Sequence, residues 1–536
     1  MKKTIAILLA LLLVAPAAVS CAGDTEKPET DFASESTDAA TEKTVETERT
    51  RQNTPDTLPD TLDFAGAEIH ILHENSDKHQ EELYVEEDTG DVLDAAIYTR
   101  NLNVEERLNV KIVPIAGEPS VDAKTAVTAG VDEYHIVAGK QWQMMQQSTE
   151  GYYFNFYDLD YIDLDQPWWA QKFIDAATIG KNRLYYLTGD ATLTLLMNMG
   201  VLYVNNTLFE NQYGSIKDLY DLVLAGDWNY DVMQTYVSGV YVDVNGDGKK
   251  DEGDTYGYSS TTASMLDYLV GGADIRFSEM DENGYPHLVL NNERSVKFTE
   301  MLYALMYENP GTYSAPPTVE GEKAIVAKFS EDTLMFLPFR AETSSQLRDM
   351  ESDYAILPFP KFDEAQENYS TAVHDSTTTL TIPITNIANQ EATCAFLEAF
   401  AAESYRTVTD VYFSTLLKEK FARDQNVDAI FDIILDGVYF DFALLHSYAL
   451  DSVGQIFRTL ISKGNNNFVS EYQKKAESYN KLMEKLIEAY DKEQYKGTVK
   501  NPLSKTHSRK LQSFDWSKRG CICMDEIIEA VLHGDE

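Results

Sequence analysis

Oxygen-bearing residues between Asp243 and Asp254 have the spacing of a calcium-binding loop. In such a loop, alternate residues of a tight turn direct oxygen atoms at one ion, and glycine at the sixth position permits the sharp bend. Gly248 holds the sixth position here. The expected ligands are the side chains of Asp243, Asn245, Asp247, Asp251 and Asp254, with the backbone carbonyl of Lys249. The pattern predicts a structural Ca²⁺ ion.

The last position of the pattern departs from the usual loop. Asp254 stands there, where the longer Glu usually binds calcium through both carboxylate oxygens. The shorter side chain favours weak binding, which suits the high calcium concentration outside cells. A turn rich in Asn, Asp and Gly that holds no metal is the alternative that the sequence leaves open.

The residues on either side of this loop resemble a known family. A Trp-led helix pattern begins at Trp228, and the run DTYGY extends from Asp254 to Tyr258. This arrangement is similar to the second lobe of extracellular solute-binding proteins of ABC importers, particularly the family-1, sugar-type lipoproteins of Gram-positive bacteria. The resemblance implies an α/β, two-lobed, periplasmic-binding-protein-like fold of type II. Each lobe is expected to be a mostly parallel sheet flanked by helices, with the ligand cleft between the lobes.

Composition limits the classes of function. The chain has 536 residues, a formal net charge of −44 and 43% apolar residues, so it can bury sizeable cores. Such an acidic protein is not expected to bind nucleic acid, because phosphates are neutralised by Lys and Arg. Four cysteines in so long a chain predict no disulfide framework.

The N-terminal residues predict export and lipid anchoring. Residues 1–20 combine a basic start with a short apolar core, which is typical of a secretory signal. The run AVSC, which ends at Cys21, resembles a bacterial lipobox and implies cleavage before Cys21 and acylation of its thiol. Residues 21–61 are acidic and rich in Thr and Ser, and are expected to form a disordered tether. We therefore expect the protein on the extracellular face of the cell membrane, anchored through Cys21.

Strand and helix patterns alternate in the next part of the chain. Apolar runs predict strands at Glu68–Leu72, Val110–Ile115 and Tyr134–Ala138, and a helix at Asp91–Leu108. This order is typical of a mostly parallel sheet, in which ligands lie beyond the carboxyl ends of strands. The predicted division is 62–188 and 375–450 for lobe 1, 189–374 and 451–496 for lobe 2, and 497–536 for a C-terminal extension of unknown role.

Sugar binding needs flat aromatic faces and planar polar groups, and loops at the expected cleft supply both. The candidate ligand-binding residues are Glu74, Asn75, Gln141, Trp142, Asp190, Trp228, Arg340, His374 and Asp375. Each has an alternative structural role. Trp228 can pack between elements of a lobe, Arg340 can form a salt bridge, and Glu74 and Asn75 can cap the following helix.

The resemblance implies a binding protein rather than an enzyme. It would capture a sugar or oligosaccharide by hinge closure and deliver it to ABC permease subunits, acting as a monomer without catalysis. The sequence contains none of the short motifs that mark serine hydrolases, zinc proteases, P-loop enzymes or dinucleotide-binding enzymes. A peptide-binding importer lipoprotein and an anchored glycan-degrading enzyme remain alternatives, because two carboxylates are enough for glycoside hydrolysis. A surface scaffold that uses calcium loops ranks last, since such modules pair two loops.

Overall fold

The computed structural model describes residues 50–418 and 427–492. The chain divides into two units, Met1–Arg49 and Thr50–Glu536, and all described residues belong to the second unit. The predicted signal, the acylation site at Cys21 and the C-terminal extension lie outside the described residues. Within the described part, no helix combines the length and apolar character needed to cross a membrane.

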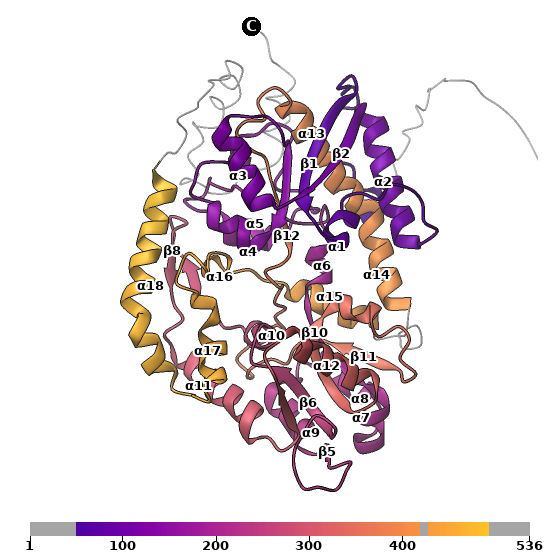
Figure 1. Cartoon of the computed structure of the whole chain (residues 1–536), viewed down its shortest axis with the longest axis vertical. Coiled ribbons are helices and arrows are strands. Elements are labelled where there is room, and N and C mark those ends of the chain that lie inside the picture. The colour runs from indigo at the N-terminus through magenta and orange to yellow at the C-terminus, as the bar shows by residue number, and fades with distance from the viewer. Residues whose placement is uncertain (1–49, 419–426, 493–536) are drawn as a thin grey trace, which may run out of the picture. The chain divides into compact units, whose positions relative to one another are not determined.

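A four-stranded sheet forms the first lobe, with strand order β12-β3-β1-β2 (Figure 1). Its strands are β1 (Ala67–Glu74), β2 (Val110–Gly117), β3 (Ile136–Lys140) and β12 (Thr378–Thr381). β1 pairs in parallel with β2 and β3, while β12 is antiparallel to β3. Parallel strands need crossover helices, which are α2 (Val92–Leu108) and α3 (Pro119–Ala129). The predicted mostly parallel sheet is therefore correct for this lobe.

The sheet of the second lobe is mixed, which corrects the expectation of a mostly parallel sheet. Its order is β11-β4-β10-β6-β5, and β9 pairs with β6. The strands are β4 (Gly200–Asn205), β5 (Tyr241–Val242), β6 (Thr255–Thr261), β9 (Thr312–Ala315), β10 (Leu334–Arg340) and β11 (Tyr354–Leu357). β10 and β11 are antiparallel to β4, and β5 is antiparallel to β6. The calcium-type loop joins β5 directly to β6, and a connection without a crossover helix reverses the chain.

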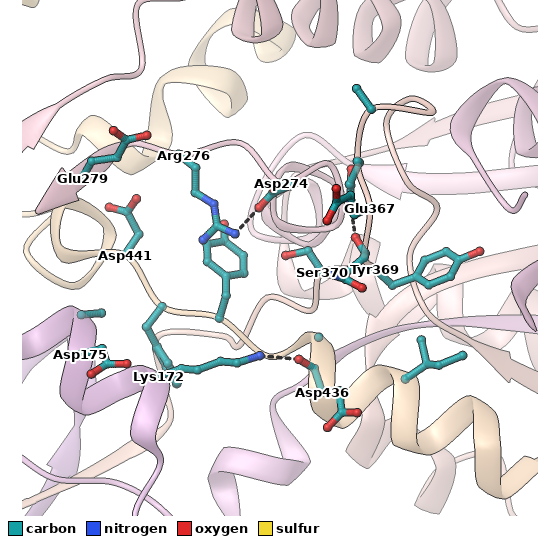
Figure 2. A pocket seen from close by; sticks show the side chains of 18 of the residues that line it. Lys172, Asp175, Asp274, Arg276, Glu279, Glu367, Tyr369, Ser370, Asp436 and Asp441 are labelled. Atoms are coloured by element: carbon teal, nitrogen blue, oxygen red, sulfur yellow. Dashed lines mark hydrogen bonds and ion pairs between the residues drawn. The ribbon is translucent and has the colours of Figure 1, made fainter. Parts of the chain in front are cut away.

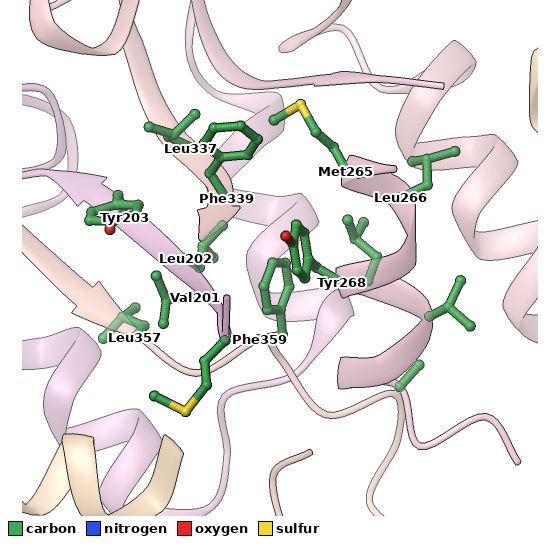
Figure 3. Packing of buried hydrophobic residues seen from close by; sticks show 14 of the residues in the cluster. Val201, Leu202, Tyr203, Met265, Leu266, Tyr268, Leu337, Phe339, Leu357 and Phe359 are labelled. Carbon is green, nitrogen blue, oxygen red and sulfur yellow. The ribbon is translucent and has the colours of Figure 1, made fainter. Parts of the chain in front are cut away.

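The core of the second lobe fixes helix α10 (Met265–Gly272) against the sheet (Figure 3). The ring of Tyr268 stacks on that of Phe359, with 6.1 Å between centroids. A Cβ atom on Gly200 would lie 2.3 Å from Cδ1 of Tyr268, so only glycine permits this close approach of β4 to the ring. The packing holds Tyr268 and its neighbour Asp267 in one position.

The buried apolar residues form two clusters, one for each lobe. Apart from Val85, Ile97 and Ile179, which join the cluster of the second lobe, membership changes between Ala191 and Leu193 and again between Tyr369 and Leu380. The main chain therefore crosses between the lobes in these two segments. A third connection is helical: α13 (Gln390–Glu403) packs in the first cluster, then a π-helical turn (Ser404–Val408) leads into α14 (Thr409–Lys418). The predicted boundaries differ at α15 (Val427–Gly437), which was assigned to lobe 1 but contributes its buried residues to the core of the second lobe.

The remaining elements surround these two cores. The helices are α1 (Asp77–Glu81), α4 (Gln141–Met144), α5 (Gln171–Ala177), α6 (Thr194–Met197), α7 (Asn206–Tyr213), α8 (Lys217–Ala225), α9 (Tyr230–Ser238), α11 (Glu293–Tyr303), α12 (Val319–Ser330), α16 (Phe442–Leu445), α17 (Ile456–Ser462) and α18 (Phe468–Asp491). A small hairpin joins β7 (Ser278–Met280) to β8 (Pro286–Leu288).

The segment from Thr50 to Thr61 was predicted as part of the disordered tether but is packed on the protein. Arg51 forms an ion pair with Asp190 at 2.6 Å, and both guanidinium Nη atoms of Arg107 bond Asp56, at 2.5 and 2.8 Å. Leu58 is buried. The composition of this stretch is polar, but its charges have specific partners that the sequence alone does not reveal.

Candidate functional site

A cleft lies beside the second crossing segment and takes residues from both lobes. Its lining includes Gln141 from the first lobe, residues 372–375 of the crossing, and residues of α10 and of the chain from 439 to 458. The side chains that line it include Gln141, Asp267, Tyr268, Phe277, His374, Asp375, Tyr439, Phe440, Leu444, Tyr448, Gln455 and Arg458. Aromatic and aliphatic groups predominate, with a few polar groups among them, which is the usual composition of a small-molecule site.

The first lobe contributes the end of β3. The backbone N–H of Gln141 donates to the carbonyl of Thr377 at 2.8 Å, and that of Trp142 donates to the carbonyl of Asp375 at 3.1 Å. Gln141 is buried, and its side-chain amide donates to the carbonyl of Leu445 at 3.1 Å. These bonds hold the strand end against the crossing segment and against the C-terminal part of the cleft.

Trp142 and Tyr448 form an aromatic pair at the edge of the cleft. Their ring centroids are 5.2 Å apart and the planes are inclined by 44°. Trp142 is half-buried, and Tyr448 is 39% exposed. Solvent therefore reaches part of both rings, and a sugar ring can stack on such a surface through its apolar face.

Asp267, Asp375 and Arg458 face the same cleft, whereas the third carboxylate of the lining, Asp441, accepts from Ser278 and from the backbone N–H of Ala443. Arg458 holds Asp267 through two contacts, Nε to Oδ1 at 2.8 Å and Nη2 to Oδ2 at 2.6 Å. Burial raises the pKa of Asp267 to about 7, and the charge of Asp375 adds to this effect while Arg458 opposes it. Burial also raises the pKa of Asp375.

The carboxylate of Asp375 has fewer hydrogen-bond and ion-pair partners than that of Asp267. Among the described residues, the partner given for its carboxylate is Nδ1 of His374 at 3.3 Å, and the side chain is 37% exposed. His374 is uncharged at neutral pH, because burial and the positive charges of Arg340, Arg458 and Lys78 lower its pKa to about 3. Asp375 can therefore accept hydrogen bonds from the hydroxyl groups of a solute.

Arg340 lies at the end of β10 and forms the salt bridge that the sequence left as an alternative. Its Nη1 lies 3.2 Å from Oε1 of Glu342. The other oxygen of Glu342 lies 2.5 Å from Nζ of Lys78, which follows β1 in the first lobe. Lys78 also donates to Oδ1 of Asn198 at 3.0 Å. The charges of Lys78, Glu342 and Arg340, together with the side-chain amide of Asn198, link the lobes.

The other predicted binding residues lie elsewhere. Glu74 is buried at the end of β1 and bonds Lys140 at 3.0 Å, whereas Asn75 is exposed. Asp190 lies in the first crossing segment, where its Oδ1 accepts from Arg51 and from Thr409, each at 2.6 Å. Trp228 is fully buried in the core of the second lobe and donates from Nε1 to the carbonyl of Pro358 at 3.1 Å. The cleft thus brings together Gln141, His374 and Asp375 from the predicted set, and Trp142 lies at its edge through its contact with Tyr448.

The cleft residues that were not predicted include Asp267, Tyr448, Gln455 and Arg458. They come from α10 and from the region of α16 and α17, which the sequence divides between two lobes. The nearest signal in the sequence is the run HSYALDS from His446, a polar and aromatic loop between helices. Nothing in that run indicates that it meets the end of β3.

The calcium-type loop has the expected turn, with Gly248 at a φ of 74°. Its carboxylates bond the loop itself: Asp243 accepts from the backbone N–H of Gly246 at 2.7 Å and of Gly248 at 2.8 Å. Asp254 is buried and accepts from the N–H of Val244 at 3.1 Å and from Tyr241 at 3.2 Å. Across the described ranges, no group of three or more His, Cys, Asp or Glu side chains is arranged to hold a metal ion. Calcium binding therefore stays a prediction.

Several solved structures that match this chain contain bound sugars. A cyclo/maltodextrin-binding protein complexed with maltotetraose matches with a TM-score of 0.51 at 11% identity, covering 79% of this chain and 97% of its own. An ABC substrate-binding protein from Listeria monocytogenes in complex with cycloalternan gives a TM-score of 0.49 at 12% identity, covering 78% and 99%. A maltose/maltodextrin-binding domain from Bdellovibrio bacteriovorus bound to maltotriose gives 0.48 at 14%, covering 79% and 100%.

These likenesses concern the fold. The chain has the two-lobed, type II periplasmic-binding-protein-like fold that the sequence predicted. No protein-family model matches the chain, and the search of curated proteins found no match.

Proposed function

We propose that this chain is the substrate-binding component of an ABC importer, which captures a sugar or oligosaccharide by hinge closure and delivers it to permease subunits. The observation that carries the proposal is the cleft, where an aromatic pair, Trp142 and Tyr448, lies beside the acceptor Asp375. The likeness of the fold to a maltodextrin-binding protein supports the same solute class.

The cleft takes a solute by contacts from both lobes. Trp142 and Tyr448 offer ring surface, Asp375 accepts hydroxyl protons, and the charges of Asp267 and Arg458 are already matched to each other. An uncharged solute therefore fits the cleft better than a strongly charged one. The pair between Lys78 and Glu342 joins the two lobes and would stabilise the closed state.

The N-terminal residues complete the proposal. Export, acylation of Cys21 and display on the extracellular face would keep the binding protein close to its permease, and a calcium ion in the loop from Asp243 to Asp254 would stiffen the second lobe. The binding protein would act as a monomer.

One observation favours a second candidate function. Asp267 and Asp375 both face the cleft, and the raised pKa of Asp267, about 7, would suit a general acid. A glycan-degrading enzyme would shorten the glycan that it binds. A peptide-binding importer protein would bind short peptides in place of sugars.

A thermal-shift screen separates these functions. A truncated protein that begins at Leu62 would lack the packed N-terminal segment, so the protein should be produced from residue 22. It is tested in calcium against mono- and oligosaccharides and short peptides. Binding to the folded state raises Tm by mass action. A concentration-dependent rise with one glycan class, with the glycan recovered unchanged by chromatography, supports import. A shortened glycan supports the enzyme, and a response to peptides alone supports peptide import.

A further inference from the structure

A second and larger groove, of about 950 Å³, adjoins the cleft and shares Tyr439, Phe440 and Asp441 with it (Figure 2). One wall is α5 of the first lobe, with Lys172 and Asp175. The other walls come from the end of α8, the loop 365–370, the chain 274–280 that includes β7, and residues 436–442. None of the residues proposed to bind the solute lines this groove.

The groove is acidic, and several of its carboxylates have no partner among the described residues. Asp175, Glu279, Glu367 and Asp436 are exposed, and the structure gives none of their side chains a hydrogen bond or ion pair. The two basic side chains of the groove already have partners. Lys172 donates to the backbone carbonyl of Asp436, and Arg276 pairs with Asp274 (Figure 2).

A buried polar group in the groove also lacks a partner. Ser370 is 4% exposed, and its Oγ has no hydrogen-bond partner within the described part of the chain. Figure 2 shows its hydroxyl directed towards the middle of the groove, on the side of Arg276. The lining further includes the apolar side chains of Leu224, Met280 and Phe440. The groove thus offers negative charge, one unused polar group and apolar surface.

The described chain ends beside this groove. Asp491, the last residue of α18, pairs with Arg183 at 2.6 Å and accepts from the hydroxyl of Tyr285 at 3.0 Å. Tyr285 is in the turn of the hairpin whose strand β7 carries Glu279 and Met280 into the groove. A fully extended chain advances roughly 3.5 Å per residue, so the residues that follow Lys492 reach the groove within a few positions.

The sequence that follows is basic, although the chain as a whole is strongly acidic. Between Gln494 and Arg519 the acidic side chain is Asp515 alone. The basic residues there are Lys496, Lys500, Lys505, Arg509, Lys510, Lys518 and Arg519. Tyr495, Phe514 and Trp516 add aromatic groups to the same stretch.

From these observations we propose that the groove is the intramolecular docking site of this basic segment, residues 495–519. The exposed carboxylates pair with its Lys and Arg side chains, and the apolar lining takes its aromatic groups. This assigns a role to the C-terminal extension that does not depend on which solute the cleft binds.

Zero-length cross-linking with a carbodiimide tests the proposal on the full mature chain. The reagent joins lysine amines to carboxylates in contact, and mass spectrometry maps the joined peptides. Links from Lys500, Lys505 or Lys510 to Asp175, Glu279, Glu367 or Asp436 are expected. The pair of Lys78 and Glu342, at 2.5 Å, serves as the internal positive control.

Two neutralising variants sharpen the result. Asp175→Asn, Glu279→Gln, Glu367→Gln and Asp436→Asn together remove the charge of the groove. Glu86→Gln, Glu87→Gln, Glu320→Gln and Glu331→Gln together remove the same charge from exposed sites outside it. With the control variant, tail-to-groove links are expected at the wild-type level.

The groove variant lacks the four acids that would be joined, so the measured quantity is the yield of links from the tail lysines to neighbouring acids such as Asp274. This yield is expected to fall several-fold relative to the wild type. The proposal is overturned if the wild-type tail links as often to Glu86, Glu87, Glu320 or Glu331 as to the groove. It is also overturned if no groove link forms while Lys78 and Glu342 are joined.

Discussion

Nζ of Lys78 lies 2.5 Å from Oε2 of Glu342, and this contact joins the two lobes. Lys78 follows the central strand of the first sheet, and Glu342 follows β10 of the second. Both side chains are mostly buried, with 26% and 20% of their surface exposed. Because the partners belong to different lobes, the pair contributes only while the lobes are together.

Breaking this pair is expected to weaken solute binding. A partly exposed ion pair contributes about 0.2–1 kcal/mol, so Lys78→Met should lower affinity by roughly 1.4- to fivefold. Isothermal titration with the solute found in the screen measures this. Lys297→Met breaks a pair within the second lobe, with Glu293 at 2.7 Å, and should leave affinity unchanged. Equal affinities for both variants would contradict a role in closure.

Removing the charge of Asp375 is expected to weaken binding more strongly. Hydrogen bonds to a charged group contribute about 1.5–3 kcal/mol, so Asp375→Asn should lower affinity by roughly tenfold or more. Asp165→Asn changes an exposed carboxylate of the first lobe and is the matched control. Unchanged affinity in Asp375→Asn, measured on protein with a wild-type Tm, would remove this residue from the site.

Glu398 makes stability depend on pH. The side chain is fully buried in α13, where Oε2 accepts from Nε1 of Trp169 at 3.1 Å and Oε1 has no partner. Burial raises its pKa to about 8, from 4.5 for an ordinary glutamate. The unfolded chain therefore loses its proton first, and the contribution of this group to stability falls as pH rises from about 4.5 to about 8.

Glu398→Gln removes the titrating group and should flatten this dependence. The Tm of the variant relative to wild type should increase between pH 5 and pH 8.5. Glu391→Gln, at an exposed position of the same helix, should show a constant difference. A Tm difference for Glu398→Gln that is the same at both pH values would show that the carboxyl does not titrate in this range.

Calcium should raise Tm if the loop from Asp243 to Asp254 binds it. The expected rise occurs at millimolar calcium, since position 12 is the shorter Asp, and magnesium at the same concentration should give less. Asp243→Asn with Asp247→Asn should abolish the response. A wild-type Tm that does not change with calcium would identify the loop as a metal-free turn.

Local patterns predicted the elements better than the site. The apolar run Glu68–Leu72 lies within β1, and the pattern Asp91–Leu108 corresponds to α2, because alternation and helical periodicity are set by near neighbours. Gln141 and Trp142 were predictable because a strand end fixes their place in a parallel sheet. The packing of the last residues of the tether was not predictable, since Arg51 and Asp56 bond partners more than fifty positions away.

Long-range packing explains the remaining differences. Trp228 has the type of a sugar platform, but its ring lies near those of Tyr236 and Phe336, and residue type alone does not distinguish a core ring from a cleft ring. Arg458 and Tyr448 reach the cleft because the chain after α15 passes between the lobes, a course that periodicity does not encode.

The packed N-terminal segment has a mechanical consequence. A pull on the chain at Thr50 would load the Arg51–Asp190 pair first and the Asp56–Arg107 pair next, and only then the strand β1. These bonds would carry a pulling force on the chain before that force could distort the central strand of the first sheet.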